Sequence, residues 1–507
     1  MTSYVLAADF GTSSLKLALF NENCELIYLA PGRYAYETYS KKPGWFEQNP
    51  LDWWYCFKKA IKDILKKYKV KRSEIKCINI GAHMGLICID ENGNPLRDAI
   101  LFFDQRSIKQ CNKIKNIIDK SLLHLCGNRV STIQTLTQIM WIKENEPKIY
   151  HKTFKFMITP GYIAYLLTGK LSYDWTHASL SLLFNIHKGT YIDDIFEIMQ
   201  LSKDKFPEPM PSFKLLGEVT EKAANETGLK AGTPVMVGAS DTPLAALAEG
   251  VIEKGKALIT AGSVSSIVTC TDETKFSTIF LNRCHVVPGR WLIQGAMNAH
   301  SNIFNWLLQE FYSFSKNFNK GKNIFKIIER DIKRSPIGAN GLLFLPYFAG
   351  ERSPLWDPYA KGVIFGLTFY HKRGDIMRAA YEGVSFAIRH NIEMMESMGI
   401  KIKELKITGG GAKSTVWNQI KSDVLGKSII VAKAEKASLI GSAMLACYGI
   451  GWIKDLLKFK IKDKHKIVYK PRKRYTRKYK KLYEIYKNLY LNLRELFKDL
   501  SIFNVSS

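Results

Sequence analysis

A carboxylate stands beside a Gly-Thr turn near the start of the chain, where Asp9 is followed by Gly11, Thr12 and Ser13. Such a turn exposes backbone N–H groups, and its glycine lets a phosphate approach closely. An acidic side chain at the end of an apolar run is well placed to hold a cation next to phosphate oxygens. Many hairpins contain aspartate and a Gly-Thr turn, so the pattern gains meaning only with further phosphate-binding turns.

A second turn of this kind occurs about halfway along the chain. The apolar run 256–261 ends at Gly262-Ser263, and a further strand is predicted over 266–270. This segment repeats the strand–turn–strand pattern of the first twenty residues, with a small hydroxyl side chain in each turn. Internal repetition of this length predicts two similar halves.

A third turn is a run of glycines. A strand predicted over 402–408 leads into Gly409-Gly410-Gly411, and a helix is predicted over 416–425. A strand, a glycine run and a helix N-terminus together form a geometry that accepts anions and nucleotides. Three phosphate-binding turns at wide separation indicate a cleft between two lobes that holds a nucleotide.

The length and the net charge of the chain limit its number of domains and the kinds of ligand that it binds. A chain of 507 residues is too long for one ordinary core, and about three domain lengths are expected. The formal net charge of +28 favours anionic ligands. It suits nucleic acid, a membrane surface or phosphorylated small molecules, and it does not choose among them.

The cysteines and the apolar segments predict a cytoplasmic protein. None of the nine cysteines forms a C-x2-C pair, and an odd number this widely spread is typical of reduced thiols. The N-terminus has no basic segment, and Asp9 interrupts its apolar run, so no secretory signal is expected. No stretch reaches the roughly 18 apolar residues of a spanning helix. We therefore expect no membrane partner.

The segment 458–481 holds thirteen Lys or Arg residues against one Asp, and tyrosines recur from there to residue 490, partly at helical spacing. One interpretation is a nucleic-acid or phospholipid patch with interleaved aromatic side chains. The other is a C-terminal helix that packs its tyrosines on the protein body and leaves its lysines in water. We favour the second interpretation, because charge runs usually coat solvated faces.

The order of several longer motifs resembles that of the FGGY family of carbohydrate kinases, and within it the xylulokinase-like branch. The resemblance covers about residues 3–450. It rests on the segments 9–16, 43–50, 53–54, 104–106, 238–241, 345–354, 362–382, 408–413 and 434–446. Each segment alone is weak, but together they are highly specific.

The resemblance implies an α/β fold of two duplicated actin-like (ribonuclease H-like) lobes that flank a central ATP cleft. On this basis we expect an N-terminal lobe over 1–250 that binds sugar and phosphate, and a C-terminal lobe over 251–457 that binds nucleotide. A basic helical tail over 458–507 follows. A sugar and MgATP are the implied ligands, and a homodimer is compatible with the sequence.

The resemblance also assigns the residues around ATP. Asp9 matches the acidic group that positions Mg²⁺, usually through water. The residues that match the family's nucleotide and phosphate loops are Thr12, Ser13, Lys16, Gly262, Ser263, Gly410, Gly411 and Ser414.

Asp241 matches the family's general base, which accepts the proton of the sugar hydroxyl that attacks phosphorus. Phosphoryl transfer asks a protein mainly for positioning and charge stabilisation, so one carboxylate suffices to orient the hydroxyl and take its proton. The alternative is an N-cap, because Thr242-Pro243 and an alanine-rich helix follow. The two roles are compatible, since a helix N-terminus can place the carboxylate at a cleft.

The sugar side matches the family less closely. His83 and Met84 occupy the positions where xylulokinases carry Met and His, but their order is exchanged. Asp104 and Arg106 match a D-x-R segment near the sugar. The structural alternatives are a hydrogen-bonded loop histidine for His83, a gap-filling methionine for Met84 and a surface ion pair for Asp104 and Arg106. The segment 298–301 also departs from the family's glycine-rich pattern.

The implied activity is ATP-dependent phosphorylation of a ketopentose, most simply D-xylulose to xylulose 5-phosphate. Another sugar, polyol or sugar acid, such as gluconate, erythrulose or glycerol, is the alternative within the family. From other classes, a non-kinase actin-like ATPase would share the lobes, and an RNA-binding protein would act through the basic tail.

Overall fold

The computed structural model describes residues 3–118, 120–262, 265–274, 277–298, 301–312, 324–432, 436–461 and 467–503, with the backbone alone at Ser301 and Ile502. The chain forms two compact units. The first unit contains 1–252, 271–293 and 436–462, and the second contains 253–270, 294–435 and 463–507. The sequence predicts a boundary at residue 250. The first long segment ends at residue 252. The segment 436–462 joins it because the helix over 437–449 packs on the N-terminal strands.

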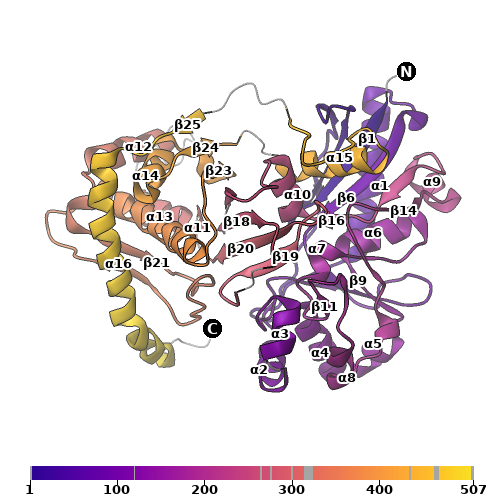
Figure 1. The fold of residues 1–507 in the computed structure, drawn as a ribbon, viewed down its shortest axis with the longest axis horizontal. Helices are drawn as coiled ribbons and strands as arrows, with labels where there is room; N and C mark the ends of the chain where they lie inside the picture. The colour runs from indigo at the N-terminus through magenta and orange to yellow at the C-terminus, as the bar shows by residue number, and fades with distance from the viewer. Residues whose placement is uncertain are drawn as a thin grey trace. The chain divides into compact units, whose positions relative to one another are not determined.

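A mixed sheet forms the centre of the first unit (Figure 1). β1 runs antiparallel to β2 and parallel to β6, β6 runs parallel to β15, and β15 runs antiparallel to β14. Every residue of β1 is buried, in keeping with its nearly continuous apolar sequence. The strands, in sheet order, are β14 (Leu215–Glu218), β15 (Pro234–Met236), β6 (Ile75–Ala82), β1 (Tyr4–Phe10), β2 (Ser14–Phe20) and β3 (Leu26–Leu29); β16 (Ala239–Ser240) also pairs with β6, and β4 (Tyr34–Ala35) with β2.

A second, four-stranded sheet in this unit has the order β5 (Glu47–Gln48), β8 (Ala99–Leu101), β7 (Gly85–Ile89) and β9 (Lys155–Ile158). The short strands β10 (Tyr173–Asp174) and β13 (Pro209–Met210) pair with each other, as do β11 (Phe184–Asn185) and β12 (Thr190–Tyr191). The helices of the unit are α1 (Pro50–Tyr68), α2 (Ile108–Ile117), α3 (Lys120–Cys126), α4 (Thr135–Asn145), α5 (Pro147–Lys152), α6 (Thr159–Thr168), α7 (Trp175–Ala178), α8 (Asp193–Ile198), α9 (Glu221–Thr227), α10 (Asp241–Ala248) and α15 (Ala437–Gly449).

A seven-stranded sheet forms the centre of the second unit, and its central strands repeat those of the first; its terminal strand, Leu281–Cys284, belongs to the first unit's segment 271–293. β17 runs antiparallel to β18 and parallel to β23, β23 runs parallel to β24, and β24 runs antiparallel to β25. The predicted internal repeat is therefore confirmed at the level of strand order and direction. The sheet order is β19 (Leu281–Cys284), β20 (Trp291–Met297), β18 (Ser265–Thr271), β17 (Lys256–Ala261), β23 (Glu404–Thr408), β24 (Ile429–Val431) and β25 (Ile467–Tyr469), and β21 (Leu343–Pro346) pairs with β22 (Gly362–Phe365) apart from it.

In the described residues of the second unit, the helices are α11 (Ser301–Tyr312), α12 (Ile324–Arg334), α13 (Arg373–Ser397), α14 (Thr415–Leu425) and α16 (Lys473–Leu500). α16 is the helix predicted for the basic tail. It buries one aromatic stripe, made of Tyr479, Tyr483, Tyr486, Tyr490 and Phe497, and its lysines are mostly exposed. This arrangement is the one expected of a packed helix with a solvated basic face, which the sequence favoured over a nucleic-acid patch.

Two further observations concern the whole described chain. All nine cysteines are buried and free of disulfide bonds. Over the residues with described coordinates, each helix is too short or too polar to cross a lipid bilayer.

Glu351, in the second unit, makes the stability of the protein depend on pH. Its Oε1 accepts hydrogen bonds from the backbone N–H groups of Asn298 and Arg352, each at 2.8 Å. Burial nevertheless raises the pKa of Glu351 to about 7. Since this pKa lies above that of the unfolded chain, the folded state binds the proton more tightly, and the stability gained is lost as the pH rises through about 7.

We therefore expect Glu351→Gln to remove this dependence. Between pH 6 and pH 8 the wild type should lose about 1 kcal/mol of unfolding free energy relative to the variant. Urea unfolding of both proteins at the two pH values measures this difference. Glu484→Gln, on the exposed face of α16, is the control, and parallel behaviour of Glu351→Gln and wild type would contradict the prediction.

Candidate active site

Three predicted site residues lie at the carboxyl ends of adjacent parallel strands of the first unit. Asp9, near the end of β1, pairs with Gly81 of β6. His83 follows β6 directly, and Asp241 follows β16, whose Ser240 pairs with Ala82. Ligands of open α/β sheets bind outside the carboxyl ends of the strands, so this edge is where a site is expected.

Hydrogen bonds donated to its carbonyl groups hold the turn between β1 and β2 in place. The Gly11 carbonyl accepts a hydrogen bond from the Tyr36 hydroxyl, and the Thr12 carbonyl accepts one from Gln48 Nε2 at 2.6 Å. The backbone N–H of Tyr36 reaches the Ser13 carbonyl at 3.4 Å. The side chains of Thr12 and Ser13 are exposed. With its carbonyl groups engaged by the protein, the turn presents its hydroxyl groups to solvent, as a phosphate loop requires.

Asp9 is a buried carboxylate with one close hydrogen-bond donor. The Ser438 hydroxyl, at the start of α15, donates to Asp9 Oδ2 at 2.6 Å. Burial raises the pKa of Asp9 to about 6, against the lowering effect of this hydrogen bond; nearby Asp241 raises it further and Lys16, opposite Asp9 on β2, lowers it. The two carboxylates and the lysine thus interact within one unit.

Asp241 is the first residue of α10 and is half-buried. Its Oδ1 accepts hydrogen bonds from the backbone N–H of Thr242 at 2.6 Å and from the hydroxyl groups of Thr242 and Ser240 at 3.2 and 3.3 Å. Ser240 occupies the N-cap position, so the N-cap interpretation of Asp241 is wrong. Within the described part of the chain, Asp241 Oδ2 has no hydrogen-bond partner and remains available to a substrate hydroxyl.

His83 is a buried imidazole with one free nitrogen. Its backbone N–H donates to the Phe10 carbonyl at 2.9 Å, and its Nδ1 lies 2.8 Å from the same oxygen. Burial lowers the pKa of His83 and favours the neutral ring. Because a carbonyl only accepts, Nδ1 carries the proton, and Nε2 is left as an acceptor. Nε2 is buried without a partner among the described residues.

Met84 connects His83 to the other sugar-side residues. Its side chain is buried, and its carbonyl accepts a hydrogen bond from the backbone N–H of Phe102 at 3.1 Å. Phe102 begins the segment that carries Asp104 and Arg106. The fold therefore brings together the two short motifs that the sequence places twenty residues apart.

Asp104 and Arg106 form a buried ion pair, so the alternative of a surface ion pair is wrong. Arg106 donates to Asp104 through Nε and Nη2, each at 2.9 Å, and to Glu47 Oε1 through Nη1 at 2.7 Å. Its guanidinium lies over the rings of Trp45 and Trp141, 4.2 and 5.0 Å from their centroids. Asp104 Oδ2 also accepts from the Phe46 N–H at 2.6 Å. Both carboxylate oxygens are thus engaged by the protein.

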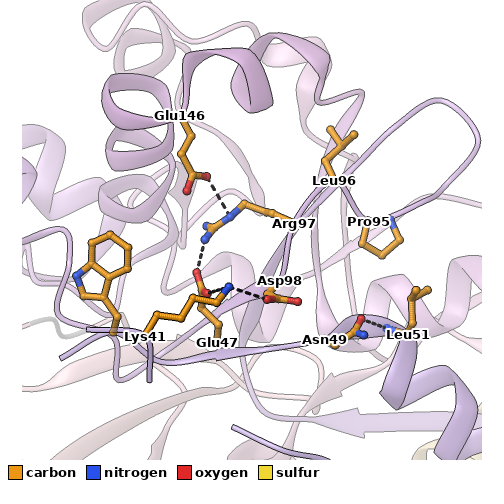
Figure 2. A pocket seen from close by; sticks show the side chains of 10 residues that line it. Lys41, Glu47, Asn49, Leu51, Pro95, Leu96, Arg97, Asp98 and Glu146 are labelled. Atoms are coloured by element: carbon orange, nitrogen blue, oxygen red, sulfur yellow. Dashed lines mark hydrogen bonds and ion pairs between the residues drawn. The ribbon is translucent and has the colours of Figure 1, made fainter. Parts of the chain in front are cut away.

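Glu47 links this pair to a surface pocket of about 390 Å³ (Figure 2). Burial opposes its ionisation, but Arg97, Arg106 and Lys41 together lower the pKa of the Glu47 carboxyl. Lys41 Nζ lies 3.1 Å from both Glu47 and Asp98. The pocket is lined by Lys41, Trp45, Glu47, Asn49, Leu51, Pro95, Leu96, Arg97, Asp98 and Glu146. The three residues at the strand ends do not line it, so it is distinct from the candidate active site.

In the second unit, two predicted turns lie at the carboxyl ends of adjacent parallel strands. Thr260 of β17 pairs with Thr408 of β23, so Gly262 and the glycine run follow neighbouring strands. A side chain at Gly409 would place its Cβ 2.7 Å from the Ala261 carbonyl oxygen, and its φ is +93°, so glycine is required there. Ser263, predicted to bind phosphate, lies outside the described residues.

Ser414 and α14 support the glycine run. Ser414 is the N-cap of α14 and accepts from the Trp417 N–H at 3.3 Å, while its hydroxyl donates to Glu329 at 3.0 Å. Gly410 and Gly411 form the short 3-10 turn before it, and a Cβ at Gly410 would meet no atom within 4 Å. Strand, glycine turn and helix N-terminus thus have the order expected of a nucleotide loop.

The described side chains provide a single carboxylate for Mg²⁺ rather than a site made of several protein ligands. No group of three or more His, Cys, Asp or Glu residues able to hold a metal ion occurs in the part of the chain that is described. Mg²⁺ keeps several waters and is commonly bound through one or two carboxylates together with substrate phosphates. Asp9, beside the phosphate-type turn, fits this mode of binding.

Several residues near the site were not identified from the sequence. Ser438 contacts Asp9 from 429 positions away. His177 is paired with Asp174, and Arg283 donates to the Ser240 hydroxyl. The Asp-x-x-His spacing of Asp174 and His177 could have drawn attention to His177, whereas no local pattern distinguishes Ser438 or Arg283.

The duplicated sheets, each with turns at the carboxyl ends of its parallel strands, define an α/β protein of the actin-like (ribonuclease H-like) fold class. The solved xylulose kinase of Rhodospirillum rubrum superposes with a TM-score of 0.89 at 27% identity, over 98% of this chain and 100% of that one.

The comparisons with families and sequences agree with this class. The N-terminal domain of the FGGY family of carbohydrate kinases matches residues 4–248, and its C-terminal domain matches 257–450. A xylulose kinase of Staphylococcus epidermidis is 30% identical over 98% of both chains. A gluconokinase of Bacillus subtilis is 29% identical over 89% of both. The chain belongs to the FGGY family of carbohydrate kinases, and it is an ATP-dependent sugar kinase.

Proposed function

We propose that this kinase transfers the γ-phosphate of ATP to D-xylulose and forms xylulose 5-phosphate. The observation that carries the proposal is the group of Asp9, His83 and Asp241 at three neighbouring strand ends, in a chain similar over its whole length to xylulose kinases. The group supplies a carboxylate base, a neutral hydrogen-bonding imidazole and a second carboxylate for the cation of MgATP.

Asp241 is the proposed general base. Its Oδ1 is held by Thr242 and Ser240, so Oδ2 is the atom that meets the sugar hydroxyl. As the hydroxyl oxygen bonds to the γ-phosphorus, the bond from phosphorus to the bridging oxygen of ADP breaks, and the hydroxyl proton passes to the carboxylate.

ATP-binding residues are proposed in each unit separately. In the first, Thr12, Ser13 and Lys16 would contact the phosphates, and Asp9 would hold Mg²⁺, which would neutralise phosphate charge. In the second, the proposed residues are Gly262, Ser263, Gly410, Gly411 and Ser414. The exposed hydroxyl groups of the first turn and the conformation of the glycine run support this assignment.

On the sugar side, His83 and Met84 are the proposed contacts with substrate. The unpartnered Nε2 of His83 supports a hydrogen bond with a sugar hydroxyl. Asp104 and Arg106 are retained as sugar-side residues in a supporting role. Their side chains are engaged with each other and with Glu47, and they hold the segment that bonds to Met84.

The role of Lys16 can be tested by replacement with methionine. Lys16 is exposed and lies opposite Asp9 on the neighbouring strand. Loss of its charge should raise the KM for ATP or lower kcat by about tenfold, because one charge-assisted contact to phosphate is lost. Steady-state kinetics at saturating sugar measure both constants. Lys62→Met on α1 is the control, and unchanged constants in Lys16→Met would remove the residue from the phosphate loop.

A screen of ADP release over keto-sugars, polyols and sugar acids tests the proposed substrate, with Asp241→Asn as the blank. D-Xylulose should give the highest kcat/KM. Gluconate is the second candidate, because a gluconokinase is 29% identical over most of the chain. Turnover of gluconate without turnover of xylulose would overturn the proposed substrate and leave the kinase activity intact.

A further inference from the structure

His177 and Arg283, which the proposed mechanism does not use, lie near the proposed base, Asp241. The Ser240 N–H donates to Thr176 Oγ1 at 2.8 Å, and Thr176 precedes His177 on α7. Arg283, on β19, donates through Nη1 to the Ser240 hydroxyl at 3.1 Å. Ser240 in turn adjoins Asp241 and pairs with Ala82, the residue before His83. The side chains of Asp241, His83, His177 and Arg283 therefore lie around the backbone at Ser240.

Three of these groups carry a buried nitrogen with no partner. His83 Nε2, His177 Nε2 and Arg283 Nε each lack a hydrogen bond within the described chain. Their residues are only 3%, 1% and 6% exposed. A buried polar atom without a partner is costly, and a cluster of three at one place indicates a ligand that supplies the missing bonds.

The chemistry of the missing partners follows from the bonds that are present. His177 Nδ1 lies 2.8 Å from Asp174 Oδ2, and a carboxylate accepts, so Nδ1 carries a proton. Burial lowers the pKa of His83, so its Nε2 is an acceptor. Nε2 of His177 is the ring nitrogen left to form a hydrogen bond with a hydroxyl group, which can donate or accept. Arg283 Nε is always a donor and suits an oxygen that cannot itself donate.

The electrostatic surroundings agree with this arrangement. Burial lowers the pKa of Arg283 to about 10, and the nearby carboxylates of Asp241 and Asp174 oppose this effect. Because these two acidic groups balance the cation, its Nε–H does not require a full negative charge and can serve a neutral carbonyl oxygen.

We propose that His177 and Arg283 belong to the acceptor site, where Arg283 Nε binds the oxo oxygen of the substrate and His177 Nε2 forms a hydrogen bond with one of its hydroxyl groups. Asp174 is the positioning residue that orients His177. This inference rests on the proposed function and deepens it, because it makes the site selective for sugars with a C=O group over the corresponding polyols.

The test compares each oxo substrate with the polyol formed by reducing its C=O group; the gluconate pair differs in charge as well. The pairs are xylulose against xylitol and D-arabinitol, its two C2-reduced forms, and gluconate against glucitol. Arg283→Met should lower kcat/KM for the oxo member of the accepted pair by about 10- to 100-fold, the effect of losing a hydrogen bond to a charged group. For the polyol member, the change should stay within about threefold. Equal losses for both members would overturn the role of Arg283.

His177 is tested with a matched pair of variants. The amide nitrogen of Asn can take the place of Nδ1 and keep the bond to Asp174, so His177→Asn removes Nε2 alone. It should raise the KM for the sugar at least tenfold while the KM for ATP and the Tm stay close to wild type. His177→Gln, which places an amide near Nε2, should recover part of the loss. An unchanged sugar KM in His177→Asn would overturn the role of His177.

Two further measurements cover variants that fail to fold. Arg283→Lys keeps the buried charge and lacks Nε, and it should show the same loss of selectivity as Arg283→Met. In the wild type, xylulose or gluconate should raise the Tm more than its polyol partners at equal concentration. Equal shifts would overturn the inference. If xylulose is not the substrate, the wild type will turn over gluconate and not xylulose. The same comparison is then made with gluconate and glucitol.

Discussion

Replacing Asp241 with asparagine is expected to lower kcat by about 10²- to 10⁴-fold while leaving the affinity for ATP close to that of wild type. Asparagine has nearly the same size, and its carbonyl oxygen can still accept the hydrogen bonds that Thr242 and Ser240 donate to Oδ1. It cannot take a proton at neutral pH. The loss therefore reports proton transfer rather than the position of α10.

Steady-state ADP release at saturating sugar gives kcat, and calorimetric titration with ATP gives the nucleotide affinity. Asp193→Asn is the matched control, since Asp193 is an exposed carboxylate in the first turn of α8 of the same unit. A kcat within about threefold of wild type in Asp241→Asn would show that another group accepts the proton.

The second large effect is expected from Gly441→Ala in α15. A Cβ at this position would lie 2.0 Å from the carbonyl oxygen of Leu244, a backbone atom of α10. A backbone neighbour cannot rotate away, so one of the two helices must shift. Overpacking of this kind costs 1–3 kcal/mol or more, and we expect Gly441→Ala to lose about 3 kcal/mol of unfolding free energy.

Activity should fall together with stability in this variant, because α10 begins at Asp241 and a shifted helix displaces the proposed base. Gly449→Ala, at the end of the same helix, is the matched control. There the new Cβ would meet Met236 Sδ at 2.2 Å, part of a flexible side chain that can move. Urea unfolding and kcat of both variants test the prediction. Equal stabilities would contradict the close packing of α10 on α15.

Much of the fold could be predicted because its determinants are local. Continuous apolar runs predict strands over 256–261 and 402–408, and the observed β17 (Lys256–Ala261) and β23 (Glu404–Thr408) agree with them to within two residues. The helix predicted over 416–425 is observed as α14 over Thr415–Leu425. Turn residues and burial periodicity act within a few positions of the chain, so a single sequence contains them.

Burial of charged groups was not predictable in the same way. Asp104 and Arg106 have the composition of a surface ion pair, and only the packing of Trp45 and Trp141 around the guanidinium makes the pair a buried one. In the same way, the sequence allows an N-cap as the alternative role of Asp241, whereas the backbone places Ser240 there. A shift of one residue in a helix start costs little locally and is decided by the strand that precedes it.

By itself the sequence determined the repeated strand–turn–strand segments, the glycine run and the acidic residues that stand beside predicted turns. Only the tertiary structure decided which of them meet. Ser438 reaches Asp9 because α15 packs on β1, and His177 and Arg283 lie near Ser240 because α7 contacts β16 and β19. Parallel pairing of β1, β6 and β16 brings Asp9, His83 and Asp241 to one edge. That pairing depends on apolar burial summed over the whole sheet, a quantity that no short segment contains.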